Sequence, residues 1–462
     1  MRKVSGLLLP SERRAITGLA SLYATRMLGL FMVLPVLALY ADELTGATPL
    51  LVGLALGVYG LTQALLQIPF GALSDRIGRK PVIAFGLVLF MIGSVVAANA
   101  ESIGGVILGR CLQGSGAVAA AIMALLADQT REQVRTAAMA TIGLSIGVAF
   151  ALAMVLGPWL AAGFGLSAVF WFTAVLAVLG LAVLWKLVPP APRRLQHRDV
   201  GIERSQLAAT LGRHELLRLD LSIFALHLIL MAIFVAVPFR LVEAGIAMER
   251  HGLTYLGVML LAFAGMVPLV ILAEKRRQMK AMCLLAIAAI TLSLGGLASL
   301  DGSLWGLLGW LLLFFIAFNL LEATLPSMLS KLAPAGAKGT AMGVYSTSQF
   351  LGAFLGGVLG GFLAQQWGLA AVFVGCGLLG VVWLGLMAGM TPPPHLASEV
   401  VALDDEHQGA ALESLAARFA EVAGVEDVLV VAEDRLAYLK VDRRHLDEEA
   451  LARVIDNPKE RA

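Results

Sequence analysis

The sequence predicts an all-α polytopic membrane protein with twelve transmembrane helices in two sets of six, followed by a small α+β domain. First, the chain of 462 residues is 59% hydrophobic and only 14% charged, with a mean hydropathy of +0.85, which excludes an ordinary soluble domain. Second, its apolar runs reach the roughly 20 residues that a bilayer core of about 30 Å requires. Third, the composition turns polar after residue 390.

Each apolar run is continuous rather than alternating, which favours helices over membrane strands. The expected spans are 15–40, 49–71, 81–99, 102–127, 136–160, 167–188, 219–240, 252–273, 280–299, 303–329, 338–365 and 369–390. The first is too long for the apolar region of a signal peptide, so we interpret it as a retained helix. Cys111, Cys283 and Cys376 all fall inside these spans, which favours a packing role for them.

Lysine and arginine gather in the loops on one side of the predicted helices. The opposite loops carry only Arg240 and Arg250. Because cytoplasmic loops of membrane proteins are enriched in these residues, we expect both termini in the cytoplasm.

The two halves of the membrane region repeat one another with a spacing near 203 residues. The stretch 165–170 recurs as 368–373, and Phe31 and Pro35 recur as Phe234 and Pro238. Two parallel sets of six helices are typical of secondary transporters, which bind substrate between the halves.

The repeat sets the expected domain boundaries. We predict a first six-helix bundle over 1–188, a cytoplasmic linker over 189–218, a second bundle over 219–390, a short linker over 391–397 and a polar domain over 398–462. In that last domain the patterning predicts the order β-α-β-β-α of a ferredoxin-like unit, with Asp447 as the cap of its second helix.

Polar residues inside the predicted spans are candidates for coupling, because a charge at mid-bilayer costs at least about 2.5–3.5 kcal/mol. Glu322 is a candidate proton carrier, since desolvation favours its neutral form. Arg26 and Arg110 could hold a substrate or a facing carboxylate, and His227 and Asn319 complete the set. For Glu322 a hydrogen bond between helices, for His227 a purely structural histidine, and for Arg110 a tether to backbone carbonyls remain open alternatives.

Further polar residues recur at helical spacing and are expected to line the pathway or to cross-link helices. The members of these stripes are Tyr59, Gln63, Gln67, Gln113, Tyr345 and Gln349.

A charged turn separates the second and third predicted spans. Its signature residues are Gly71, Asp75, Arg76, Gly78, Arg79 and Lys80. A turn that only fixes orientation would need the cations but neither the aspartate nor the glycines.

This turn resembles motif A of major facilitator superfamily drug:proton antiporters, and the stretch from Arg110 to Ala117 resembles motif B of that family. The stretch 153–158 resembles motif C, but Ala153 stands where that motif has its first glycine. The resemblance implies the twelve-helix fold, antiport, a multi-pass location in the bacterial inner membrane, and a C-terminal ferredoxin-like (YAM) domain.

The resemblance also implies a conformational latch. In the family the aspartate that corresponds to Asp75 lies against the N-terminus of the eleventh helix, here about 338–342, where the helix dipole favours a carboxylate. Arg79 and Asp128 would complete this network, which would stabilise the outward-facing state.

We therefore expect a proton-driven exporter of small amphipathic molecules rather than an enzyme. A metabolite uniporter or symporter, or a membrane sensor that uses the C-terminal domain, are the alternatives. The sequence contains neither a nucleotide-binding loop nor a metal-binding cysteine pair, so we expect no cofactor and no metal. The expected partners are the bilayer, protons and one small substrate, without nucleic acid, for a monomer in the membrane.

Overall fold

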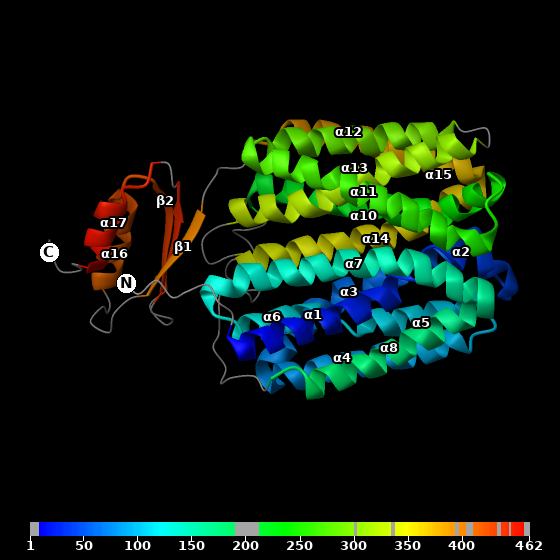
Figure 1. Cartoon of the computed structure of the whole chain (residues 1–462), viewed down its shortest axis with the longest axis horizontal. Helices are drawn as coiled ribbons and strands as arrows, with labels where there is room; N and C mark the ends of the chain where they lie inside the picture. Colours follow the sequence, from blue (N-terminus) through cyan, green and yellow to red (C-terminus); the bar gives the residue numbers. More distant parts are fainter. Residues whose placement is uncertain are drawn as a thin grey trace.

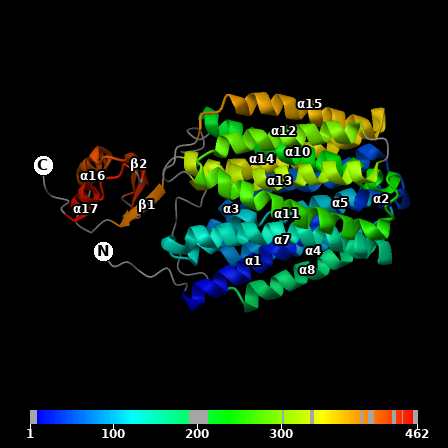
Figure 2. The same ribbon diagram turned by 45° about the horizontal axis from the view of Figure 1, so that its top comes forward.

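The computed structural model describes residues 9–189, 212–299, 303–333, 338–392, 397–402, 410–431, 436–442 and 445–456. Long helices run side by side along the long axis of the molecule, and the polar C-terminal domain sits at one end of them (Figures 1 and 2). We call this end of the helical bundle the domain end and the opposite end the distal end.

The first half of the chain supplies one side of the bundle, and the second half supplies the other (Figure 1). The first comprises α1 (Pro10–Phe31), α2 (Leu37–Tyr40), η1 (Ala41–Glu43), α3 (Pro49–Ile77), α4 (Arg79–Ala98), α5 (Ile103–Ser115), α6 (Ala119–Asp128), α7 (Glu132–Phe164) and α8 (Leu166–Lys186). The second comprises α10 (His214–Glu243), η2 (Met248–Arg250), α11 (His251–Lys275), α12 (Met279–Ala298), α13 (Leu304–Leu332), α14 (Lys338–Trp367) and α15 (Leu369–Ala388).

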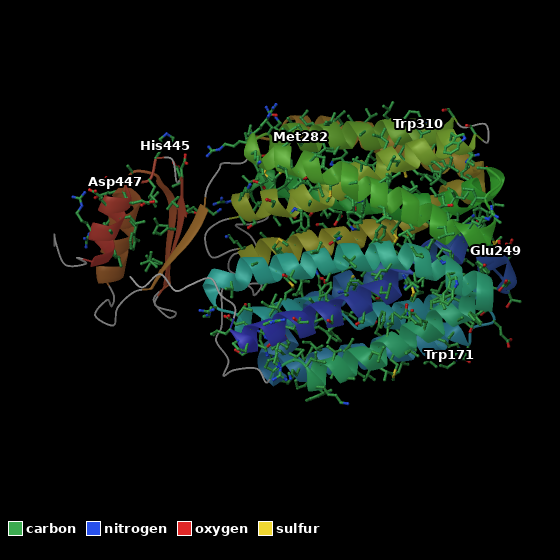
Figure 3. The ribbon with its side chains drawn as sticks, viewed as in Figure 1. Trp171, Glu249, Met282, Trp310, His445 and Asp447 are labelled. Carbon is green, nitrogen blue, oxygen red and sulfur yellow. The ribbon has the colours of Figure 1, made fainter. Side chains whose placement is uncertain are left out.

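Eleven segments of the described chain are helical, long enough and apolar enough to cross a membrane. The first predicted span, α1, falls short of that apolarity because Arg14 and Arg26 interrupt it. Many apolar side chains cover the outside of the bundle (Figure 3), among them Trp171 and the 81% exposed Trp305. Such a surface suits contact with lipid chains rather than with water.

The structure differs from the predicted elements at three places. The span 15–40 is not one helix, because Pro35 lacks an amide hydrogen, so α1 ends at Phe31 and α2 follows after a turn. The span 102–127 is confirmed as one membrane-crossing segment, but its helix is interrupted between α5 and α6, around Gly116. The linker expected over 189–218 ends earlier, because α10 already begins at His214; its part 190–211 lies outside the described residues.

Helix α14 meets two neighbours through two separate rows of glycine. Gly352, Gly356 and Gly360 lie directly against the backbone of α10, within the second half. Gly357 and Gly361 lie against the start of α3, and Gly53 of α3 faces Gly357 across the boundary between the halves. The halves are therefore joined backbone to backbone at the distal end.

The C-terminal domain is a three-stranded antiparallel sheet with two helices. Its sheet order is β1 (Ala397–Ala402), β3 (Leu436–Val441), β2 (Val425–Val431), and its helices are α16 (Ala410–Glu421) and α17 (Glu448–Asp456). Phe419 and Leu439 are buried in its core. Asp447 accepts a hydrogen bond from the amide of Ala450 at 2.9 Å, as expected of a helix cap. The predicted order of strands and helices is confirmed.

Candidate functional site

One buried polar cluster lies in the first half around Arg26. The Nη2 of Arg26 donates to Oε1 of Gln63 at 2.7 Å and to the carbonyl of Gly116 at 2.9 Å. The break between α5 and α6 makes the carbonyl of Gly116 accessible, because in a continuous helix it would accept a hydrogen bond from the backbone of the next turn. The guanidinium also lies 5.8 Å from the ring centres of Tyr59 and Phe90.

The guanidinium group of Arg110 also lies over Tyr59, 5.1 Å from the centre of its ring. It is fully buried, and its three guanidinium nitrogens donate to the carbonyls of Ala55 and Leu56 and to Oε1 of Gln113. Gln113 in turn donates to the hydroxyl of Ser94. Of the two roles considered for Arg110, this geometry favours the tether between α5 and α3.

A second polar cluster lies in the second half, where α10, α13 and α14 meet. His227 Nε2 lies 2.8 Å from Nε2 of Gln349 and 3.5 Å from Oε1 of Glu322. Its Nδ1 lies 3.3 Å from the carbonyl of Ile223. If Nδ1 donates to that carbonyl, the neutral ring accepts from the amide of Gln349, and Glu322 is left without a cation.

The remaining candidates are spread along the same helices. Asn319 donates to the carbonyl of Phe315, one turn earlier, and Tyr345 is buried with an unpartnered hydroxyl. Gln67 donates to Thr347 at 2.8 Å and therefore links the two halves. Among the predicted polar stripes, Gln67 thus links two helices, whereas Gln63 and Gln113 bind the two buried arginines and Gln349 contacts His227.

Sequence reasoning missed Asp220. It lies two turns before His227 on α10 and is buried, with its Oδ1 unpartnered. The signal was available, because Asp220, the seventh residue of α10, is an acidic residue within an apolar helix, as Glu322 is.

The charged turn between α3 and α4 forms a compact network at the domain end. Arg79 pairs with Asp75 and, at 3.2 Å, with Asp128. Lys80 donates to the carbonyl of Val188 at 2.6 Å, and Gly78 adopts φ +106°, which favours glycine. Gly71 and Arg76 lie in the last turns of α3.

Asp75 remains 48% exposed, and within the described part of the chain its ion pair is with Arg79. The resemblance assigns the latch against α14 to the outward-facing state, and in this structure α3 and α14 are in backbone contact at the distal end. The latch therefore stays a prediction.

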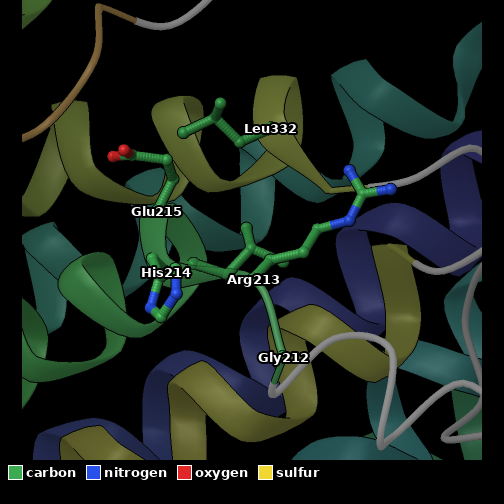
Figure 4. A pocket seen from close by; sticks show the side chains of 6 residues that line it. Gly212, Arg213, His214, Glu215 and Leu332 are labelled. Atoms are coloured by element: carbon green, nitrogen blue, oxygen red, sulfur yellow. The ribbon is translucent and has the colours of Figure 1, made fainter.

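The C-terminal domain contacts the bundle through a buried lysine. Lys440 of β3 donates to the carbonyls of Lys331 and Ala333, at the end of α13, the first at 2.8 Å. Beside this contact is a pocket of about 410 Å³ (Figure 4), in which the Arg213 side chain extends away from Glu215. Gly212, Arg213, His214, Glu215, Leu216 and Leu332 line the pocket.

This contact is expected to strengthen as the pH rises. Burial, with the charges of Lys338 and Arg213, lowers the pKa of Lys440 to about 8, whereas an undocked lysine titrates near 10.4. Between these values the docked state binds fewer protons, so docking gains free energy with increasing pH. The mean distance between a spin label on the domain and one on the bundle should therefore decrease as the pH rises from about 8 to about 10, the interval between the two pKa values.

Lys440→Met should remove this pH dependence, whereas Lys275→Met, at an exposed position of the same end, should retain it. If the distance between the labels changed equally with pH in the two variants, the pH dependence of docking would belong to groups other than Lys440.

The fold and these clusters can now be compared with known proteins. The family model of the Major Facilitator Superfamily matches residues 19–357 and again 327–418. The chain belongs to this superfamily. The chain is 47% identical over 435 residues to the inner membrane transport protein YajR of Escherichia coli, covering 94% of this chain and 95% of that one.

More distant members of the superfamily are similar over much of the chain. The multidrug resistance protein MdtH of Aeromonas salmonicida is 26% identical, over 69% of this chain and 79% of its own. A bacterial homologue of the human lysosomal transporter Spinster, in an inward-facing and occupied conformation, superposes with a TM-score of 0.68 at 14% identity, over 83% of this chain and 97% of that one. The chain is thus a multi-pass inner-membrane transporter and not an enzyme.

Proposed function

We propose that this superfamily member exports small amphipathic molecules in exchange for protons, as a monomer with the domain end in the cytoplasm. Export is supported by the similarity to MdtH, which is named for multidrug resistance. The orientation is supported by the cationic side chains at the domain end, among them Arg76, Arg79 and Lys80.

The observation that carries the proposal is the environment of Glu322. Its carboxyl group lies midway along α13, Oε1 has no hydrogen-bond partner, and its ion-pairing neighbour among the described residues is His227. An ionised carboxylate held there without a cation is costly, so the neutral form is favoured while the site is enclosed.

The same side chain is 33% exposed, so it is not sealed inside helix packing. A carboxyl group that is neutral when enclosed and ionised when hydrated can bind a proton on one side of the membrane and release it on the other. The rocking of the two halves exposes the group to each side in turn. Substrate that occupies the site in the other half-cycle completes the exchange.

The test is proton-dependent efflux from proteoliposomes. Three naphthalene probes serve as candidate substrates, one anionic (naphthalene-2-sulfonate), one neutral (naphthalene-2-sulfonamide) and one cationic (a naphthyl trimethylammonium). An imposed pH gradient is expected to drive net transport of at least one probe. Glu322→Gln should abolish this gradient response, because the amide cannot bind and release a proton.

Glu249→Gln removes a carboxylate from an exposed distal position and should leave the response intact. Unchanged pH dependence in Glu322→Gln would overturn the assignment of the proton carrier. Probe exchange that ignores the gradient would favour a uniporter, and proton-driven uptake a symporter. A truncation of residues 395–462 that transports normally but no longer responds to a cytoplasmic ligand would favour sensing by the C-terminal domain.

A further inference from the structure

The cluster around Arg26 contains more hydrogen-bond donors than acceptors. Four of its buried atoms have no partner: Nε and Nη1 of Arg26, Nε2 of Gln63 and the hydroxyl of Tyr59. All four can donate, and only the hydroxyl can also accept. The three side chains are 2%, 0% and 1% exposed, so bulk water does not reach them.

Arg110 shows that these free donors are not a general property of buried arginines in this fold. Both guanidinium groups lie over the same Tyr59 ring, yet every nitrogen of Arg110 has an acceptor. Within the described part of the chain, moreover, no carboxylate forms an ion pair with Arg26. The charge of Arg26 and two of its nitrogens, Nε and Nη1, are therefore available to bind a ligand.

An unpaired charge and unsatisfied donors in a low-dielectric interior are costly and are normally matched by a partner. The partner that matches all of them is an oxyanion, because the oxygens of a carboxylate, sulfonate or phosphate accept charge-assisted hydrogen bonds from guanidinium, amide and hydroxyl donors alike. The rings of Tyr59 and Phe90 offer apolar surface beside it. A cationic or purely donating ligand would leave the cluster unsatisfied.

We propose that the cluster of Arg26, Gln63 and Tyr59 binds the anionic head of the transported molecule, so that the substrates are amphipathic organic anions. This inference rests on the proposed transport function and specifies its substrate class. Because Arg26 and Glu322 belong to opposite halves of the bundle, the anion and the proton occupy separate sites.

Binding is tested on the full-length protein in nanodiscs, with naphthalene-2-sulfonate as the probe. This anion stays charged at all relevant pH values, and its sulfonamide has nearly the same shape without the charge. The sulfonate is expected to raise the unfolding temperature in a saturable manner, and the sulfonamide is not. Arg26→Gln should weaken sulfonate binding by about tenfold or more, as expected when a hydrogen-bonded charge is lost.

Two further variants keep the test decisive if Arg26→Gln folds poorly. Gln63→Glu supplies a carboxylate beside Arg26 and should abolish the sulfonate response while the unliganded protein stays folded. Tyr59→Phe keeps the ring but removes one donor, so it should weaken sulfonate binding by a smaller factor. Arg250→Gln removes a guanidinium from an exposed position and should bind as the native protein does.

Three results would overturn the inference: equal responses to sulfonate and sulfonamide, no sulfonate response at millimolar concentration, or full sulfonate binding by Gln63→Glu. Proton-driven efflux of the neutral or cationic probe alone would also overturn it, while the proposed exchange with protons would stand.

Discussion

Gly53→Val is expected to hold the distal ends of the two halves apart and to reduce transport to background. A Cβ at residue 53 would overlap the carbonyl oxygen of Gly357 and press on the backbone of Gly361. Backbone atoms cannot rotate away as a flexible side chain can, so the clash is relieved only if α3 and α14 separate. Because this contact joins the halves, each half should remain folded.

The separation is measured by electron paramagnetic resonance, with spin labels at the exposed positions 42 and 366 near the distal ends of the two halves. The distance distribution should shift to longer values in Gly53→Val and lose its short component. Gly257→Val is the matched control, because a Cβ there meets no other atom within 4 Å. A native distribution in Gly53→Val would mean that the observed glycine contact does not limit closure.

Gly356→Val should instead destabilise the second half. A Cβ at residue 356 would overlap the carbonyl oxygen of Leu228, and α10 and α14 belong to the same half. The strain therefore cannot be relieved by opening the molecule. Overpacking of this kind costs roughly 1–3 kcal/mol or more.

Thermal unfolding followed by light scattering and intrinsic fluorescence measures the loss. We expect a clearly lower unfolding temperature for Gly356→Val and an unchanged one for Gly309→Val, where the added atoms meet open space. If Gly53→Val destabilised the protein as much as Gly356→Val does, the distinction between contacts within and between the halves would be wrong.

The sequence predicted the elements that depend on composition. The apolar runs and the β-α-β-β-α tail follow from local patterns, and the described part of the chain contains eleven candidate spans and that order of strands and helices. Two sets of glycines in α14 stand four residues apart, 352, 356 and 360 in one and 357 and 361 in the other, a spacing typical of close helix packing. The spacing does not reveal that the first set meets α10 and the second meets α3 of the other half, because that depends on long-range packing.

The candidate site was only partly predictable for the same reason. Arg26 and Arg110 look alike in sequence, since each is a lone arginine inside an apolar helix. They differ in their surroundings: Arg110 donates to the carbonyls of Ala55 and Leu56, whereas Arg26 lies beside the helix break at Gly116. Whether a buried donor finds an acceptor depends on long-range packing, which spacing along one helix does not reveal.

The attachment of the C-terminal domain has an evolutionary consequence. Lys440 recognises main-chain oxygens of residues 331 and 333, which every amino acid presents. Replacing the side chains at those positions would leave its acceptors in place. The attachment of the domain through Lys440 should therefore tolerate changes of amino acid at positions 331 and 333.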